Sequence, residues 1–558
     1  MGTAAQELTG GEAIVRSLVN EGVEMVFALP GVQIYSLIDA FALAGDAITV
    51  ICPRHEQAAA YMAFGYARST GRPGVYAVVP GPGVLNSTAA LSSAYATSTP
   101  LVCVTGEVPS AFIGAGKGHL HELPDQLATL RTLTKWAWNI DQPADVPALV
   151  AQAFAQATTG RPRPVALAMP WDALERSGEV PPAQRAPRVT PALDADAVER
   201  AARLICDAEN PMIMVGGGAF GAAEEVLELA ELLQAPVVSF RSGKGVVASD
   251  HHLGFSCAEG FERWAHTDVL IGIGSRLELQ WFRWPDQPRE LRIVDIDIDP
   301  DQPGRVGADV AVIGDAADGS AALSAALRGL RAEAPSRREE FEALKARKHA
   351  EIQRVTPHVA FVQAIREVLP RDGFFVEELC QAGFASYFAF PVYEPRTFVT
   401  AGAQGTLGFG FQTALGVKAG NPGRKVVSIT GDGGFQFGVA ELATAVQYGL
   451  DVVTVLFNNN AYGNVLGDQM RRFGGRVLGA RLRNPDFVRL AESYGVRAAR
   501  APTPQELTRA LDAALERGEP ALIEVPVESA DERSPWEFLM PPPRRMAGTT
   551  ATGGGSDV

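Results

Sequence analysis

Residues 426 to 465 read VVSITGDGGFQFGVAELATAVQYGLDVVTVLFNNNAYGNV. An apolar segment, 426–430, ends at GDGG, an amphipathic segment follows over about 438–448, and a second apolar segment, 451–457, ends at three asparagines. This pattern predicts a strand, a helix and a strand, and such a crossover makes the two strands parallel. Both polar clusters should therefore lie at the carboxyl edge of one sheet, where ligands of open α/β sheets bind.

The residue types in these clusters indicate what would bind there. Gly431, Gly433 and Gly434 let backbone N–H groups come close to an anion at the start of a helix. Asp432 and, 27 positions later, Asn459 offer hard oxygen ligands, which suit Mg²⁺ or Ca²⁺ rather than zinc. The stretch therefore predicts a site for a metal-bridged diphosphate, although GDG alone also occurs as an ordinary glycine-rich turn.

GDG followed at this distance by paired asparagines resembles the metal–diphosphate motif of thiamine-diphosphate enzymes, in particular the acetolactate synthase-like group with its benzaldehyde lyase and 2-hydroxyacyl-CoA lyase relatives. The resemblance covers about residues 10–530. It implies thiamine diphosphate and Mg²⁺ as cofactors. By the same resemblance, the metal is bound by Asp432, Asn459 and the backbone oxygen of Ala461, and the pocket continues along Gly463, Asn464 and Val465.

Length and composition set the class of protein. A chain of 558 residues, 47% hydrophobic and 20% charged, can form about three domains with large cores. A net charge of −15 without basic blocks argues against a nucleic-acid partner. Five scattered cysteines, no signal peptide and no apolar run of 18 residues predict a cytoplasmic protein without a membrane span.

Strand and helix patterns alternate along most of the chain, which predicts α/β architecture with doubly wound parallel sheets. A proline-rich linker, 181–191, separates the first two segments, and apolar residues near Trp536 suggest that the tail forms a lid. We expect a pyrimidine-binding domain over 1–185, a middle domain over 192–345, a diphosphate-binding domain over 355–528, and a tail over 529–558 with a disordered end.

Glu56, in PRHEQAAAYMAFGYAR, follows a predicted strand and begins an alanine-rich helix. A glutamate at a helix N-terminus is also favoured simply by the helix dipole. The segment resembles the one that carries the family's activating glutamate, which contacts the cofactor's aminopyrimidine. In that family this glutamate serves the diphosphate domain of another subunit, so the resemblance implies a homodimer or homotetramer with active sites at subunit interfaces.

A second segment, AGAQGTLGFGFQTALG from residue 401, resembles the one that holds the cofactor in its bent shape. Leu407 matches the supporting apolar side chain, and the backbone of Gly405 should contact the pyrimidine. Leu379 and Cys380 align loosely with a loop that contacts the diphosphate, although Glu378 stands where relatives often have glycine. An ordinary strand–helix junction with a core leucine is the plain alternative.

The substrate side is predicted from loops of the first domain. A polar side chain there could relay a proton during the reaction, although His121 could equally be a surface-loop histidine. By resemblance, the candidates for cofactor or substrate contacts are Gly31 and Gln33 after a PG turn, Gly83 and Asn86 in GPGVLN, and His121 and Gln126 in GHLHELPDQ.

The middle segment contains VGGGAFG after a strand, which is a weak signal for phosphate binding. Asp295 and Asp297 lie too far along the chain for a dinucleotide fingerprint. The flavin-binding loops of acetolactate synthases are matched only at Arg276, so FAD is possible but not favoured.

Val465 stands where some decarboxylase relatives carry an acid that protonates the intermediate. Its absence favours a carboligase or lyase that joins or cleaves two carbonyl fragments, with a 2-keto acid, an acyloin or an acyl-CoA as the small-molecule substrate. Five arginines within 470–483 leave a CoA-thioester lyase or oxalyl-CoA decarboxylase-like enzyme as an alternative. A non-catalytic relative is a further alternative, against which Glu56, Asp432 and Asn459 argue.

Overall fold

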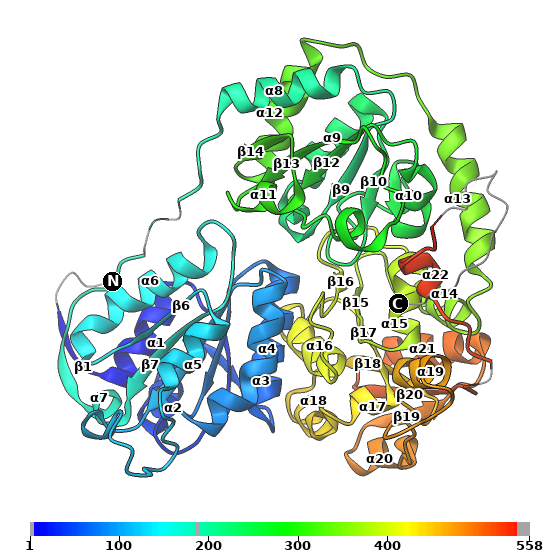
Figure 1. Cartoon of the computed structure of the whole chain (residues 1–558). Helices are drawn as coiled ribbons and strands as arrows, with labels where there is room; N and C mark the ends of the chain where they lie inside the picture. Colours follow the sequence, from blue (N-terminus) through cyan, green and yellow to red (C-terminus); the bar gives the residue numbers. More distant parts are fainter. Residues whose placement is uncertain (1–4, 186, 188, 530, 544–558) are drawn as a thin grey trace.

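The computed structural model describes residues 5–185, 187, 189–529 and 531–543. It contains three six-stranded sheets, and within each of them every neighbouring pair of strands is parallel (Figure 1). The prediction of three doubly wound α/β domains is therefore confirmed. Central strands such as β4 (Gly74–Val78) and β12 (Val269–Ile273) are buried at every position, as expected for parallel sheets covered on both faces.

The first domain has the strand order β3-β2-β4-β5-β7-β6. Its helix α3 (Glu56–Thr70) is capped by the side chain of His55, and α4 (Pro82–Ala96) follows the GP turn after β4. The other elements that matter below are β2 (Met25–Ala28), β3 (Thr49–Ile51), β5 (Leu101–Glu107), β6 (Trp136–Asn139) and β7 (Val165–Pro170).

The middle domain has the order β11-β10-β9-β12-β13-β14. The glycine run after β9 (Met212–Val215) forms a 3₁₀ turn, Gly217–Gly221, and the helix α9 (Ala223–Leu233) begins after it. Its remaining strands are β10 (Val237–Ser239), β11 (Gly254–Ser256), β13 (Arg292–Asp297) and β14 (Val310–Ile313). The helix α13 (Arg338–Ile352) follows the middle sheet in the chain, before the third domain begins.

The third domain has the order β16-β15-β17-β18-β20-β19 and contains the predicted βαβ unit. It consists of β17 (Val426–Gly431), α18 (Leu442–Tyr448) and β18 (Val452–Asn458), with a short helix, α17 (Asp432–Phe435), at the GDG turn. The helices α14 (His358–Val368), α15 (Gln381–Ala389) and α16 (Phe409–Gly420) pack nearby. The strands β15 (Phe374–Val376), β16 (Phe398–Val399), β19 (Arg497–Arg500) and β20 (Ala521–Pro526) complete the sheet.

Helices α3 and α16 join the first and third domains. At Gly65 an added Cβ would lie 2.1 Å from the carbonyl oxygen of Thr413, and at Gly416 it would lie 1.9 Å from that of Met62. Tyr61 also donates a hydrogen bond to Thr406 across this contact, at 2.7 Å. The two helices can approach this closely only because both positions are glycine.

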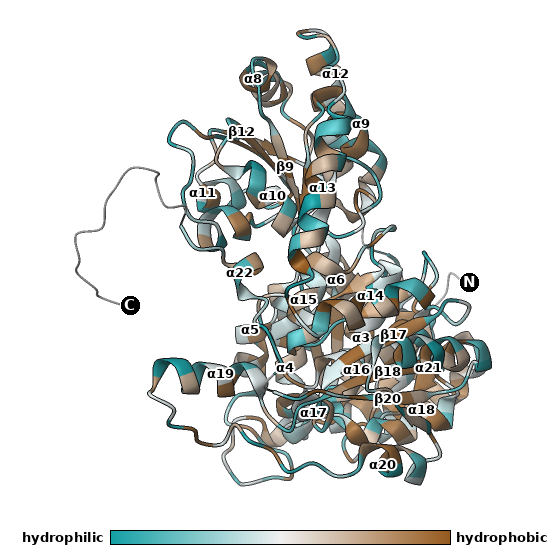
Figure 2. Ribbon diagram, turned by 90° about the vertical axis from the view of Figure 1, so that its right-hand side faces the viewer, coloured by the Kyte–Doolittle hydropathy of each residue, from teal (hydrophilic) through white to brown (hydrophobic). Residues whose placement is uncertain are grey.

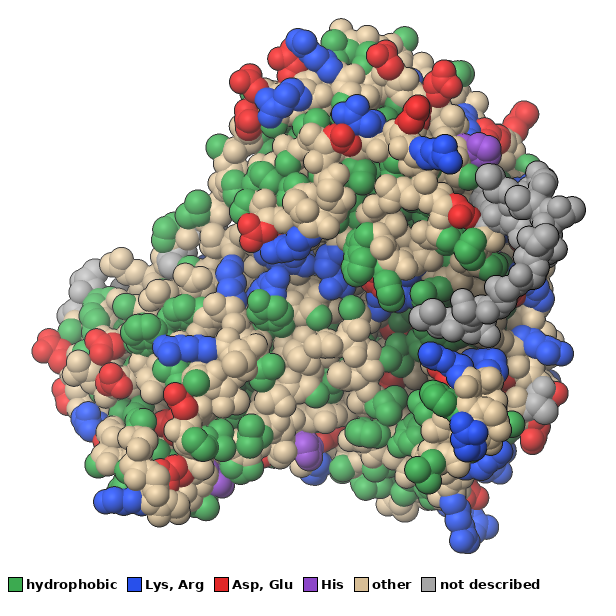
Figure 3. Space-filling view, in the orientation of Figure 1, with side chains coloured by type: hydrophobic (Ala, Val, Ile, Leu, Met, Phe, Trp, Pro, Cys, Tyr) green, Lys and Arg blue, Asp and Glu red, His purple; other side chains and the backbone are tan. Residues whose placement is uncertain are grey.

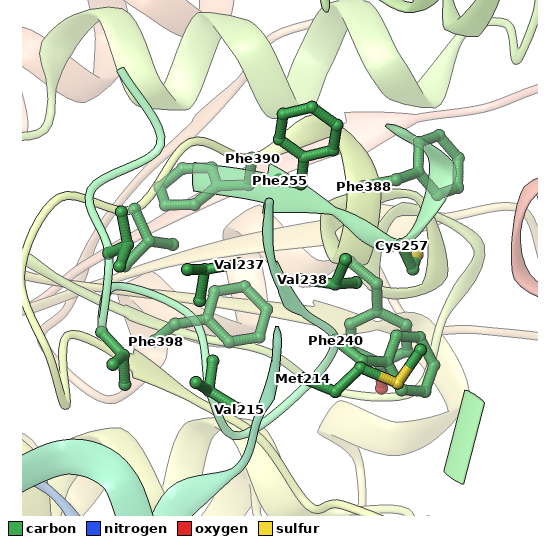
Figure 4. Close-up of a cluster of buried hydrophobic side chains, with 14 of the residues drawn as sticks. Met214, Val215, Val237, Val238, Phe240, Phe255, Cys257, Phe388, Phe390 and Phe398 are labelled. Atoms are coloured by element: carbon green, nitrogen blue, oxygen red, sulfur yellow. The ribbon is translucent and has the colours of Figure 1, made fainter. Parts of the chain in front are cut away.

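Aromatic side chains fill the junction between the middle and third domains (Figure 4). Phe390 stacks on Phe375 with ring centroids 4.0 Å apart, and Phe255 packs against Phe341 at 5.2 Å. In Figure 2 the strands of the middle sheet carry hydrophobic residues, and the helices around them are more polar. The helix α19 (Gly463–Arg472) projects from the third domain in the same view. Within the described part of the chain, no helix is long and apolar enough to cross a membrane.

Candidate active site

A cavity of about 370 Å³ opens in the third domain where β17 and β18 end. Every third-domain residue proposed from the sequence lines it. These are Leu379, Cys380, Gly405, Leu407, Gly431, Asp432, Gly433, Gly434, Asn459, Ala461, Gly463, Asn464 and Val465. Segments that are far apart in the sequence meet here because parallel strands place their carboxyl ends at one edge.

Asp432 and Asn459 supply the oxygen atoms expected of a metal site. Asp432 is 2% exposed and has no Lys or Arg within ion-pair distance among the described residues. Burial raises the pKa of its carboxyl group, while Asn484, which donates to Oδ2 at 2.6 Å, opposes that rise. Asn484 also contacts Asn458 and was not identified from the sequence, because it lies on a later loop without a motif of its own. A buried carboxylate without a cation fits a divalent ion of the Mg²⁺ type.

The glycines of the turn are required by close contacts. A Cβ at Gly433 would lie 2.4 Å from the ring of Tyr462, and one at Gly434 would lie 2.1 Å from Oε1 of Glu378. A Cβ added at Gly431 would lie 3.2 Å from the Cβ atom of Cys380. The backbone of this turn is therefore open to an anion, since no side chain can stand between its N–H groups and the cavity.

Glu378, noted in the sequence only as a departure, has a definite structural position. It is fully buried, accepts N–H bonds from Gly408 and Gly410, and accepts the hydroxyl of Thr430 at 2.8 Å. Burial raises its pKa to about 7. This carboxyl group ties the loop that carries Leu407 to the end of β17, so it fixes two walls of the cavity relative to each other.

The C-terminal tail closes one side of the same cavity. Glu532 lines it and accepts hydrogen bonds from Nδ2 of Asn459 at 3.2 and 3.1 Å and from Nε2 of His358 at 3.1 Å. The short helix α22 (Trp536–Leu539) follows, and the indole of Trp536 donates to Oδ1 of Asn464 at 2.8 Å. The sequence indicated the apolar residues of this tail but not Glu532. The predicted disordered end falls outside the described residues.

The first-domain candidates form a separate polar cluster. Glu56, half-buried at the start of α3, accepts a hydrogen bond from Nδ2 of Asn86 at 3.0 Å. His121 meets Oε1 of Gln33 at 2.8 Å, and both residues adopt positive φ angles, 64° and 76°. Burial lowers the pKa of His121, while the nearby charge of Glu56 opposes that effect. The loops therefore bring four of the proposed residues together at one edge of the sheet.

Gln126, Gly31 and Gly83 have other surroundings. Gln126 is 3% exposed, accepts from the N–H of Gly81 at 2.8 Å and donates to the carbonyl of Gly106 at 2.9 Å, so its amide holds two loops together. At Gly31 and Gly83 an added Cβ would lie 2.6 and 2.8 Å from the side chain of Val79. These hydrogen bonds and close contacts account for glutamine at position 126 and for glycine at positions 31 and 83 without a bound ligand.

None of the first-domain candidates lines the third-domain cavity, whose lining residues all fall between His358 and Glu532. Glu56 and Asp432 therefore belong to different surfaces of the single chain, although α3 and α16 pack the two domains together.

The middle domain borders a further cavity, of about 170 Å³, where it meets the other two domains. Gly216–Gly218 and four arginines, Arg68, Arg161, Arg241 and Arg276, line it. Figure 3 shows Lys and Arg side chains gathered in this hollow. Burial lowers the pKa of Arg68 to about 9. Two of the four arginines are paired with acids, Arg241 with Glu278, which also lines the cavity, and Arg161 with Asp299.

Three parallel-sheet domains, with a glycine turn and a buried carboxylate at the carboxyl edge of the third, are the arrangement of an α/β protein with a ligand cavity at a sheet edge. Comparison with protein families identifies which one. The N-terminal TPP-binding, central and C-terminal TPP-binding domains of thiamine pyrophosphate enzymes match residues 8–129, 198–325 and 380–525. The chain belongs to this family and is a thiamine-diphosphate-dependent enzyme of the transferase or lyase class.

Similar curated proteins agree with this assignment. A probable acetolactate synthase large subunit of Methanocaldococcus jannaschii is 35% identical over 94% of this chain and 93% of its own length. A probable 2-ketoarginine decarboxylase of Pseudomonas aeruginosa is 35% identical over 93% and 94%. The acetolactate synthase isozyme 3 large subunit of Escherichia coli is 32% identical over 91% and 92%.

Proposed function

We propose that the protein is a thiamine-diphosphate- and Mg²⁺-dependent carboligase or lyase that acts on a 2-keto acid or an acyloin. The observation that carries the proposal is the cavity in which Asp432, Asn459 and the Gly431–Gly434 turn meet. Its buried, uncompensated carboxylate and open backbone amides fit a metal–diphosphate group. Acetolactate synthases and a 2-ketoarginine decarboxylase among the relatives support a 2-keto acid as the donor.

In this proposal the third domain holds the cofactor. Asp432, Asn459 and the backbone of Ala461 bind the metal, and the amides of the glycine turn bind the diphosphate. Leu407 supports the bend between the two rings, and Glu378 keeps its loop in place. When bound, thiamine diphosphate supplies an electron sink for breaking and making bonds at a carbonyl carbon.

In this proposal the residues that transfer protons during the reaction belong to the first domain. The carboxylate of Glu56, which accepts a hydrogen bond from Asn86, would exchange a proton with the aminopyrimidine of the cofactor at its Oε atom. His121 and Gln33 share a hydrogen bond and offer a donor and an acceptor near the substrate. Their αL backbone conformations are uncommon for residues with side chains, and such strain often accompanies functional loops.

Because Glu56 does not line the cavity of its own chain, we propose that two copies form each active site. The apolar side chains of the projecting α19 region support this, since Val465, Met470 and Phe473 are each about half exposed in the single chain. The inactive Glu56→Gln and Asp432→Asn proteins can be dissociated, mixed and allowed to reassociate. Half of the random dimers are then mixed, and each mixed dimer has one intact site out of two, so about a quarter of the parental activity should return. No recovery from verified mixed dimers would contradict shared sites.

The reaction is tested with a substrate panel. The protein with thiamine diphosphate and Mg²⁺ is incubated with pyruvate, benzoylformate, acyloins or a 2-hydroxyacyl-CoA, and CO₂ release and ligated products are followed by NMR. We expect a ligated or cleaved two-carbonyl product. Activity restricted to the CoA thioester would contradict the proposal, as would complete inactivity with a loaded cofactor.

Simple decarboxylation is the second candidate, favoured by the 2-ketoarginine decarboxylase relative. An aldehyde as the sole product, even with excess acceptor, would select it. The arginine-rich segment 470–483 contributes no residue to the lining of the cavity, so the CoA alternative gains no support from this site. The middle-domain cavity, at about 170 Å³, is smaller than typical small-molecule sites of about 300–1,000 Å³, so we do not include FAD.

A further inference from the structure

A second large cavity, of about 630 Å³, lies between the middle and third domains beside the edge strand β11. Its walls come from β10, β11, α13, α14 and the segment after α15. No residue lines both this cavity and the cofactor cavity, and none is shared with the arginine-lined cavity of the middle domain. Its volume falls within the range of small-molecule sites, about 300–1,000 Å³.

Among the described residues, four Lys and Arg side chains line this second cavity, and each of three of them contacts at least two protein acceptors. The ammonium of Lys345 donates to three backbone carbonyls at 2.7 to 2.8 Å. Lys348 forms ion pairs with Glu262 and Glu351. Arg366 donates to the carbonyls that follow its own helix and lies over an aromatic ring at 5.0 Å.

Lys244, the fourth, is 3% exposed. Its ammonium donates to the carbonyl of Tyr387 at 3.0 Å, which is the one hydrogen bond found for it within the described ranges, and it lies 5.4 Å from the ring centroid of Phe398. Glu259 is the carboxylate that acts on it from a distance, but Glu259 is bonded to the backbone of Ser256 at 2.6 Å. Burial lowers the pKa of Lys244 to about 8. A buried ammonium with unused donors favours an anionic partner.

The remaining wall combines apolar side chains with polar ones, among them Glu259, Glu367, His349 and three serines. Phe388, Phe390, Tyr393 and Ile352 face the cavity beside the polar side chain of Gln363. A ligand that combines one negative charge with an apolar body would satisfy both parts of the wall. A strongly hydrated dianion would leave the aromatic side chains unused.

Two helices connect this cavity to the cofactor site. His358, at the start of α14, lines the cofactor cavity, whereas Arg366, near its end, lines the second cavity. Gln381 begins α15 at the cofactor cavity, and Phe388 lies at its other end in the second cavity. Helices are stiff, so a shift at one end is transmitted to the other.

We propose that this cavity is an effector site for a small organic monocarboxylate with an apolar body, whose carboxylate pairs with Lys244 and whose binding alters the cofactor site through α14 and α15. The site lies outside the chemistry proposed above and does not depend on which reaction the enzyme performs.

Benzoate is the probe, and benzamide is its uncharged match. Isothermal titration of the full chain, loaded with thiamine diphosphate and Mg²⁺, should show benzoate binding at least about tenfold more tightly than benzamide, since hydrogen bonds to charged groups contribute about 1.5–3 kcal/mol. Lys244→Met removes the charge, and Gln363→Trp fills the cavity without altering Lys244. Each should weaken benzoate binding by about tenfold or more.

Lys425→Met is the matched control, because Lys425 is a half-buried lysine that donates to one backbone carbonyl away from this cavity. Its benzoate affinity should equal that of the parent. Benzoate that bound in the active site instead would be insensitive to Gln363→Trp, and that result overturns the proposal. So do equal affinities for benzoate and benzamide, tighter binding of inorganic phosphate, or no binding of benzoate up to about 10 mM.

The proposed coupling between the second cavity and the cofactor site is tested by a separate measurement. The dissociation constant of thiamine diphosphate, determined with and without saturating benzoate, should change in the parent and stay constant in Gln363→Trp. An unchanged constant in the parent would overturn the effector role.

Discussion

Glu532 offers the sharpest test of how the tail and the metal site depend on each other. Both of its oxygens accept from Nδ2 of Asn459, at 3.2 and 3.1 Å, and Oε1 also meets His358 at 3.1 Å. The amide nitrogen of Asn459 is held by Glu532, and its Oδ1 accepts the backbone N–H of Ala461 at 3.1 Å, so both ends of the amide are fixed beside the proposed metal site. We therefore expect Glu532→Ala to release this amide and weaken cofactor binding.

The magnitude follows from the hydrogen bonds that the substitution removes. A hydrogen bond to a charged group contributes about 1.5–3 kcal/mol, so removing the acceptor of Asn459 should raise the dissociation constant of the thiamine diphosphate–Mg²⁺ pair by about 10- to 100-fold. Glu532→Gln keeps one acceptor oxygen and should have a smaller effect. The side chain of Glu532 is only 13% exposed, so solvent cannot easily replace it.

Cofactor binding can be followed by tryptophan fluorescence, because Trp536 contacts Asn464 at the wall of the cavity. Glu537→Gln is the matched control, since Glu537 lies on the same tail but pairs with Arg354 and is 43% exposed. It should bind the cofactor like the parent. A folded Glu532→Ala protein with parental cofactor affinity would refute the reasoning, and so would an equal loss in both variants.

Three further predictions concern the site. Glu56→Gln should lower kcat by about 100-fold or more while cofactor affinity changes little, as measured by steady-state kinetics and fluorescence titration; parental turnover would contradict the role of Glu56. Asp432→Asn should abolish Mg²⁺-dependent cofactor retention, and a protein that still retains the cofactor after gel filtration would argue against Asp432 as a ligand. Glu378 has a pKa raised to about 7, so its folded form binds a proton more tightly than the unfolded chain, and its contribution to stability is lost as pH rises from about 4.5 through 7. Glu378→Gln should therefore flatten the fall in unfolding free energy between pH 5 and 7.5, by up to about 3 kcal/mol, in denaturant titrations; identical pH profiles would contradict the assignment.

Local sequence was sufficient for the cofactor half of the site. A buried strand followed by glycines and an acid, with a second strand 27 positions on, fixes where the polar groups lie, because parallel strands share one carboxyl edge. For the same reason the third-domain candidates, from Leu379 to Val465, line one cavity.

The tertiary structure decided what no local pattern contains. Glu378, Asn484 and Glu532 are charged or polar residues without a motif, and each reaches the site only because distant segments fold against it. The separation of Glu56 from the cavity is likewise a result of how α3 packs on α16 through Gly65 and Gly416. The sequence by itself placed the candidate cofactor-binding groups at one edge of a sheet, because periodicity and turn chemistry act over a few residues. Which surfaces meet depends on long-range packing, so only the three-dimensional structure could show that Glu56 lies outside the cavity that Asp432 lines.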